Sequence, residues 1–181
     1  MKGVGPLKMV ASPKPLLGAP AFHGAVLTID YPKKETIIRE SSYDITRLPH
    51  HPHDLLLTPE WVDGYLPILK GVLAGRPARF VLDSGCGGIV ISTRFARQFP
   101  TSSFGKATTA NINDVQVNIR CLKLVSGIVA GTHFQANHVQ VIDLPGDFDA
   151  LIGTDFPGLS RVTIDYPRRK VLLKPYSGGR R

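Results

Sequence analysis

The chain has 181 residues, of which 43% are hydrophobic and 20% are charged, a balance that supports a packed core and excludes a largely disordered polymer. Its 22 basic and 14 acidic residues give a formal charge of +8, but aromatic and basic residues do not alternate as they do in RNA-binding proteins, so we expect a solvated basic surface and no nucleic-acid partner. No apolar run reaches the roughly 18 residues of a membrane-spanning helix, so we expect no membrane partner. The two cysteines do not form a disulfide framework.

The first elements of the chain are repeated at its end. Residues 16–38 (LLGAPAFHGAVLTIDYPKKETII) match residues 151–173 (LIGTDFPGLSRVTIDYPRRKVLL) without a gap, and TIDYP is identical in both. Each copy predicts a strand, a turn that begins at the Tyr-Pro pair and has a basic tip, and a second strand. We interpret residues 1–40 as the C-terminal remnant of a first repeat, whose beginning lies upstream of Met1 or is absent.

Residues 41–58 (SSYDITRLPHHPHDLLLT) are expected to form a linker. Pro49 and Pro52 interrupt regular structure, and polar residues dominate the first half. The HHPHD stretch at residues 50–54 contains metal-ligand residue types, but neighbouring ligands in a proline-broken loop rarely converge. We therefore expect no metal site.

Short apolar segments separated by Gly, Pro, Asn and Asp predict a complete all-β lobe over residues 59–176, closed or nearly closed, followed by a tail at residues 177–181. A short helix is expected at residues 93–99, with Phe95 and Phe99 on one face. The strands are expected at residues 65–73, 78–82, 89–92, 108–124, 138–142, 162–165 and 170–173.

Three segments of this lobe resemble those of one protein family. Residues 80–85 (FVLDSG) resemble the D-[ST]-G active-site loop of aspartic proteases, and residues 149–156 (DALIGTDF) resemble the second signature of that family. Residues 162–173 resemble the closing hairpin of its bacterial and retroelement members. The resemblance to retropepsin-like aspartic proteases implies a closed barrel lobe with one or two short helices. Cys86 departs from the family, which usually has a small residue such as Ala there.

The resemblance implies an aspartic endopeptidase that needs no cofactor or metal. Asp83 would be the catalytic carboxylate, Ser84 would hold the loop across a two-fold interface, and Gly85 would let the backbone approach the carboxylate closely. Such enzymes use two aspartates, and the chain contains one D-[ST]-G motif. The second aspartate would come from a homodimer or from a preceding lobe. The alternative is an inactive peptide-binding or dimerisation module of the same fold.

The polypeptide substrate would lie under a flap, and the hairpin at residues 108–119 is our candidate for it. Asn111, Ile112 and Asn113 at its tip are the expected substrate contacts. An ordinary surface hairpin is an equal alternative for this segment.

Overall fold

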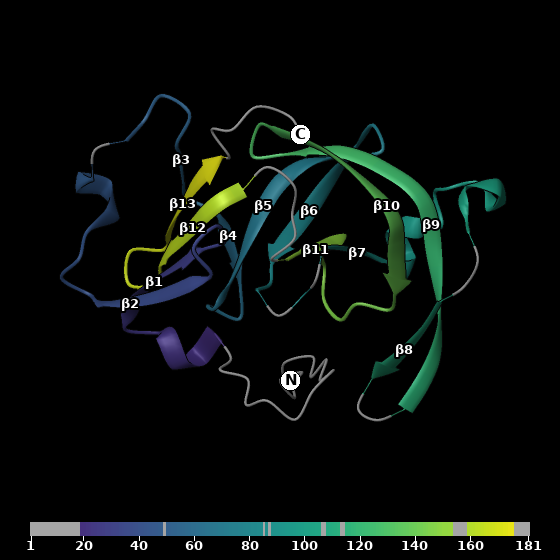
Figure 1. The fold of residues 1–181 in the computed structure, drawn as a ribbon, viewed down its shortest axis with the longest axis horizontal. Coiled ribbons are helices and arrows are strands. Elements are labelled where there is room, and N and C mark those ends of the chain that lie inside the picture. The colour runs from purple at the N-terminus through teal and green to yellow at the C-terminus, as the bar shows by residue number, and fades with distance from the viewer. Residues whose placement is uncertain are drawn as a thin grey trace.

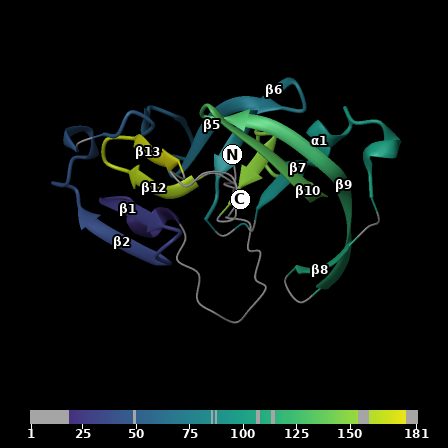
Figure 2. The same ribbon diagram turned by 45° about the horizontal axis from the view of Figure 1, so that its top comes forward.

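A computed structural model of the chain describes residues 19–48, 50–84, 86, 88–105, 108–112, 115–153 and 159–175, with the side chains of 108–112, 115–118, 159 and 175 left undescribed. Strands account for 55% of the structure, which confirms the predicted all-β class. They form two sheets that lie next to each other in both views of the ribbon (Figures 1 and 2).

Six strands close into a barrel, as the sequence predicted, because the neighbour order β5-β6-β11-β7-β10-β9 ends where β9 pairs back onto β5. Closure brings two backbones unusually close: a Cβ on Gly127 would lie 2.4 Å from the carbonyl oxygen of Val72. The barrel strands are β5 (Leu66–Leu73), β6 (Arg76–Leu82), β7 (Ile89–Ser92), β9 (Val115–Val129), β10 (Thr132–Ile142) and β11 (Ala150–Ile152).

Several short helices and strands lie outside the six barrel strands. The predicted helix begins where expected but forms a single turn, α1 (Thr93–Ala96), whose first turn is capped by Ser92 Oγ accepting a hydrogen bond from the Phe95 amide at 3.1 Å. No helix in the described part of the chain is long and apolar enough to cross a membrane. The other elements are η1 (Ala19–Phe22), η2 (Ile45–Arg47), η3 (Thr101–Ser103), β4 (Glu60–Val62) and β8 (Thr108–Ile112).

The second sheet runs in the order β2-β1-β12-β13-β3, so strands from the first and last parts of the chain pair with each other. One face packs on the barrel, because Leu27, Val162 and Leu173 belong to the same buried cluster as Phe80 of β6. Its strands are β1 (Ala25–Asp30), β2 (Glu35–Glu40), β3 (Leu55–Leu57), β12 (Leu159–Asp165) and β13 (Lys170–Pro175). The stretch 41–58, expected as a linker, thus contributes β3, whose three leucines pair with β13.

The two copies of the repeat are related by a local two-fold axis. Thr28 of β1 and Thr163 of β12 occupy the same position in the repeat, and they face each other in the antiparallel β1–β12 pair. Equivalent residues that oppose each other in an antiparallel pair lie on a two-fold axis. The buried hydroxyls of the two threonines, 3.1 Å apart, share a hydrogen bond across it.

The predicted turns of the two copies contain equivalent hydrogen bonds. Asp30 accepts a hydrogen bond from the Lys33 amide at 3.2 Å, and Asp165 accepts the matching one from the Arg168 amide at 3.0 Å. Both aspartates are buried. Their carboxylates therefore serve the turns, as the sequence indicated.

An ion pair between Asp30 and Arg161 ties the two copies together, with Arg161 Nε 2.9 Å from Asp30 Oδ2. Burial acts to raise the pKa of the Asp30 carboxyl, but the hydrogen bonds from Arg161 and the Lys33 amide outweigh it, so the pKa lies below the ordinary 3.8. A lowered pKa in the folded state means that the ionised carboxyl stabilises the fold above pH 3.8, and that this stabilisation is lost as the pH falls through the folded-state value.

We therefore expect Asp30→Asn to lower the urea midpoint of unfolding at neutral pH, and expect the difference from the parent to shrink in acid, as the pH falls below 3.8 and the Asp30 carboxyl becomes protonated. The exposed turn variant Asp63→Asn is the control and should leave the midpoint unchanged at both pH values. A gap between Asp30→Asn and the parent that persists undiminished in acid would contradict the ionic role.

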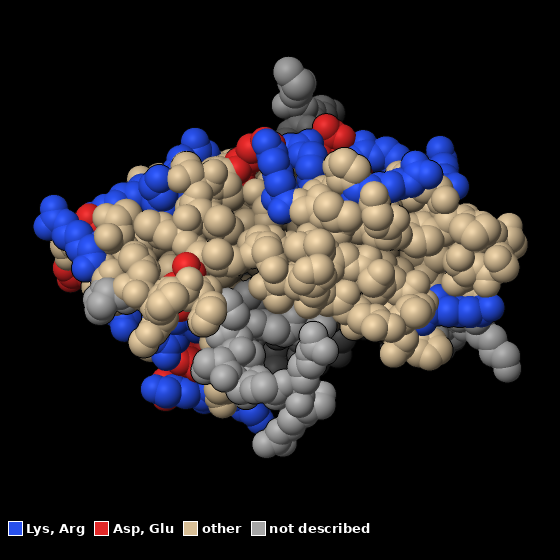
Figure 3. Space-filling model, turned by 90° about the horizontal axis from the view of Figure 1, so that it is seen from above, with Lys and Arg blue, Asp and Glu red and all other residues tan. Residues whose placement is uncertain are grey.

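Figure 3 shows the charges on one face of the molecule. Lys and Arg side chains lie around the outline of this face, those at its upper edge lie among Asp and Glu, and a broad band without charge crosses the middle.

Candidate active site

The D-S-G loop begins where β6 ends. Asp83 follows Leu82 directly, its amide donates to the Ile152 carbonyl oxygen at 3.0 Å, and its own carbonyl oxygen accepts from the Cys86 amide at 3.0 Å. These two bonds fold the chain into a tight turn anchored on β11. The Asp83 side chain is half-buried and that of Ser84 is exposed, while Gly85 lies outside the described residues.

The turn is anchored because β11 lies between the two strands that flank it. Residues 150–152 pair in parallel with the end of β6 and antiparallel with β7, so the loop that joins β6 to β7 passes over the end of β11. Every residue of β7 and β11 is buried. The apolar pair and glycine of the second signature are thereby brought against the D-S-G loop, although the two motifs lie far apart in the sequence.

Gly153 is the point of closest approach between the two motifs. A Cβ at this position would lie 1.7 Å from the carbonyl oxygen and 2.4 Å from the carbonyl carbon of Cys86, so only glycine fits beneath the loop. The Gly153 amide donates to the Gly88 carbonyl oxygen at 2.8 Å, which fixes the other end of the same loop. The loop is therefore held at both ends by β11 and the residue that follows it.

Asp149 fastens β11 in this position, a role that the sequence analysis did not assign. Its carboxylate accepts from the Arg79 amide at 2.9 Å, its amide donates to the Arg79 carbonyl oxygen at 2.8 Å, and its carbonyl oxygen accepts from the Ser92 amide at 2.8 Å. Arg94 of α1 approaches the same carboxylate at 3.4 Å. One residue thus links β6, β7 and α1, and an aspartate directly before a short buried strand is the signal that could have suggested it.

A hydrogen bond to Asp147 raises the pKa of Arg94, and the same bond holds the pKa of the Asp147 carboxyl below its usual range. Arg79 also reaches Asp147, at 2.9 Å, so two cations flank this exposed carboxylate. The Arg94 guanidinium is about half exposed, and we assign this network a positioning role rather than a large part in stability.

Cys86, the departure from the family pattern, is buried with 2% of its surface exposed. It packs in a cluster that includes Val81, Val90 and Leu151, so its side chain occupies an apolar site under the loop. A small apolar residue is what this position requires, and cysteine satisfies that requirement.

The expected flap is a real hairpin. Asn111 and Ile112 pair with Gln116 and Val115 as the last residues of β8 before the tip, while Asn113 lies outside the described residues. Figures 1 and 2 both show the β8–β9 hairpin projecting from the barrel. The structure therefore contains the hairpin that the sequence predicted.

Among the described residues, no group of three or more His, Cys, Asp or Glu side chains is arranged to hold a metal ion. In the histidine-rich stretch, the Asp54 carboxylate accepts from the His51 amide at 3.1 Å and pairs with Lys174 at 3.0 Å. This carboxylate therefore stabilises the local fold.

One protein-family model matches the part of the chain that contains the loop. Residues 69–156, which contain both signatures, match the protein-family model described as Aspartyl protease. A similar solved structure is that of a retropepsin-like aspartic protease from Rickettsia conorii, with 16% sequence identity, a TM-score of 0.44, and coverage of 66% of this chain and 89% of that chain. No curated protein matches the chain. The segment at residues 69–156 therefore belongs to the aspartyl protease family.

Proposed function

We propose that this chain provides one half of the active site of an aspartic endopeptidase, with Asp83 as one of the two carboxylates. The observation that carries the proposal is the seating of the D-S-G loop on Gly153, because a catalytic carboxylate must be held in a fixed position on a rigid support. In this role Ser84 and Gly85 belong to the active-site loop.

The reaction is hydrolysis of a peptide bond by water. Two carboxylates about 3 Å apart cannot both be ionised, so they share one proton, and aspartic proteases are the familiar example of such a pair. The ionised member removes a proton from the water as it attacks the carbonyl carbon, and the protonated member donates to the carbonyl oxygen. The proton that was taken from the water is then transferred to the leaving nitrogen as the C–N bond breaks.

The second carboxylate would come from a lobe attached to the first copy of the repeat. In a symmetric dimer of this chain, β12 of one molecule would pair with β12 of the other at Thr163, but β1 already occupies that edge. The two-fold axis between Thr28 and Thr163 relates the β1–β2 hairpin to the β12–β13 hairpin. Since β12 and β13 are the last strands of the described lobe, the symmetry supports a second lobe whose last strands are β1 and β2.

The substrate would be an extended polypeptide held between the loop and the β8–β9 hairpin. An extended peptide can add to a strand edge through backbone hydrogen bonds, which suits a flap made of two strands. Asn111, Ile112 and Asn113 at the tip are the proposed contacts. An inactive module would bind peptides through the same surfaces without cleaving them.

The test compares the 181-residue chain with the same polypeptide extended through the lobe that carries the first copy. We expect the extended protein to cleave an unfolded protein substrate best on the acid side of a series from about pH 3 to about pH 7, and expect a pepstatin-type inhibitor to stop it. The shorter chain should cleave far more slowly. If the extended protein binds peptides but releases no products at any pH, the inactive-module alternative is correct.

A further inference from the structure

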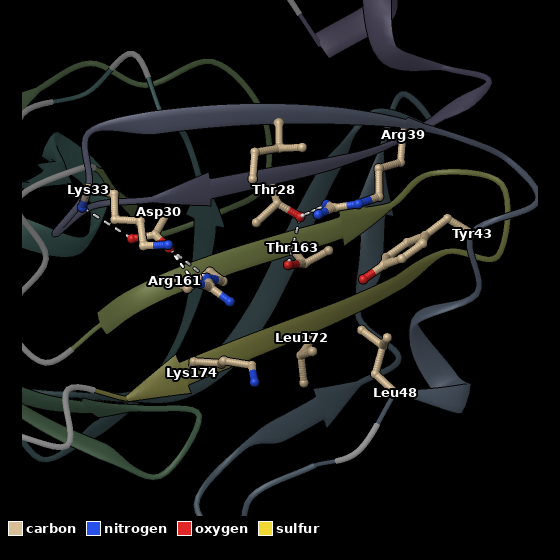
Figure 4. Close-up of a pocket in the computed structure, with 11 residues that line it drawn as sticks. Thr28, Asp30, Lys33, Arg39, Tyr43, Leu48, Arg161, Thr163, Leu172 and Lys174 are labelled. Atoms are coloured by element: carbon tan, nitrogen blue, oxygen red, sulfur yellow. Dashed lines mark hydrogen bonds and ion pairs between the residues drawn. The ribbon is translucent and has the colours of Figure 1, made fainter.

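A cavity lies on the face of the second sheet that points away from the barrel, at the seam between the two copies of the repeat (Figure 4). Its volume is about 380 Å³, within the range of about 300–1,000 Å³ typical of small-molecule sites. Its walls come from β1, β2, β12, β13 and the segment around η2. The cavity is separate from the D-S-G loop, so binding of a ligand there does not depend on the proposed function.

The lining is strongly basic. Four of the described residues that line the cavity are cationic and one, Asp30, is anionic, and outside the lining Asp54 pairs with one of the four at 3.0 Å. With both carboxylates counted, an excess of two positive charges remains around a partly enclosed space, where water screens charges less than on an open surface. The cationic residues are Lys33, Arg39, Arg161 and Lys174.

Arg39 of β2 is the cation best placed to take a ligand. Its Nη1 donates to Thr28 Oγ1 at 3.3 Å, and the guanidinium carbon lies 4.5 Å from the centre of the Tyr43 ring. No carboxylate of the described residues lies within ion-pair distance of Arg39. A guanidinium has five N–H donors in a planar fork that matches an oxyanion, and the Tyr43 ring holds this fork in position.

Other polar groups converge on the same space. Arg161, which also lines the cavity, uses its Nε and Nη2 on Asp30, and neither of these bonds involves its Nη1. Figure 4 shows the Tyr43 hydroxyl pointing into the cavity beside Leu172, and the Thr163 hydroxyl joined to that of Thr28. The cations and hydroxyl donors come from different strands and approach from different directions. This arrangement suits a tetrahedral dianion better than a planar carboxylate, which one guanidinium would satisfy.

The remaining wall is apolar. Ile37 of β2, Leu48 after η2 and Leu172 of β13 supply apolar surface within the lining, beside the charged groups. The volume exceeds what a bare phosphate needs, since one water occupies about 30 Å³ of the liquid. We propose that this cavity binds a small organic phosphate ester, with the phosphate held by Arg39, Arg161 and Lys174 and the organic group against the apolar wall.

The test titrates the 181-residue chain with phenyl phosphate, inorganic phosphate and acetate at constant ionic strength, followed by calorimetry and by the amide NMR signals of Thr28 and Thr163. Phenyl phosphate should bind saturably and at least about tenfold more tightly than acetate, with inorganic phosphate between them, because only the ester uses both walls. Both threonine signals should move with the same dissociation constant. Equal affinity for the three anions, or no saturable binding, would overturn the proposal.

Arg39→Gln removes the guanidinium and its charge and leaves a shorter amide, and we expect it to weaken phenyl phosphate binding at least about tenfold. Arg39→Lys should recover part of the affinity because the charge returns without the fork. Arg76→Gln, in the exposed hairpin between β5 and β6, removes one charge far from the cavity in the fold and should bind as the parent does. If Arg76→Gln weakens binding as much as Arg39→Gln, the anion responds only to the net charge of the protein, and the proposed site at Arg39 is excluded. Circular dichroism checks that each variant is folded.

Discussion

Replacing Asp83 by Asn is expected to lower peptide cleavage by the extended protein by about 10²–10⁴-fold or more, because an amide can neither activate water nor share a proton with a second carboxyl. The fold should not change, because Asn has nearly the same volume, the Asp83 side chain is only half-buried, and the substitution keeps the two backbone hydrogen bonds of residue 83. The measurement is kcat/KM on an unfolded protein substrate, with the urea midpoint determined on the same sample.

Asp143→Asn makes the same chemical change at an exposed position after β10 and should cleave at the parental rate. Loss of activity in Asp83→Asn, with a parental urea midpoint and a normal Asp143→Asn, would assign the chemistry to this carboxylate. An Asp83→Asn protein that cleaves at an undiminished rate and still responds to a pepstatin-type inhibitor would place the catalytic carboxylate elsewhere.

Gly153→Ala is expected to destabilise the protein strongly, although it adds only one methyl group. The new Cβ would have to lie 1.7 Å from the Cys86 carbonyl oxygen, and since that atom belongs to the backbone, the loop or β11 must move. Inserting a methyl group into a packed region costs about 1–3 kcal/mol, and a clash with backbone places this substitution at or above the upper end of that range. Because the displaced atoms belong to the D-S-G loop, cleavage should fall even where the protein remains folded.

Gly24→Ala is the matched control, because a Cβ at Gly24 would meet no atom within 4 Å. Urea unfolding of both variants separates the local clash from the general effect of replacing glycine. A Gly153→Ala protein as stable and as active as Gly24→Ala would show that the loop does not rest on this residue.

The parts of the fold that could be predicted from the sequence are those in which neighbouring residues carry the information. The TIDYP turns of both copies appear where the repeat indicated, because an aspartate that accepts from an amide three residues later acts within one turn. The strand that leads into Asp83 and the buried strand after the loop were also predicted, because continuous apolar runs indicate burial on both faces.

Pairing between distant segments could not be predicted in the same way. Strand β9 continues beyond the expected end at residue 124 as far as Val129, because Gly127 lies where closure of the barrel brings two backbones together. Residues 55–57 were expected within a linker, because Pro49 and Pro52 interrupt that stretch and polar residues dominate its first half. They form a strand because β13 offers an edge.

The same difference between local motifs and pairing of distant segments applies to the candidate sites. Asp83 could be named from its motif, because the motif is local. The support from Gly153 and Asp149 depends on how β11 fits between β6 and β7, which is a property of the whole barrel. The basic cavity could not be foreseen, since Arg39 and Arg161 come from opposite ends of the chain and meet only because the two copies pair.

The pairing of β1 onto β12 also has a consequence for how the molecule behaves in a crowded solution. Without the first hairpin, β12 would present a row of unsatisfied amides and carbonyls beside apolar side chains such as Val162 and Ile164. Such an edge recruits strands from other molecules and leads to domain exchange or fibre growth. The first copy of the repeat therefore covers a strand edge through which the described lobe would otherwise pair with a second molecule.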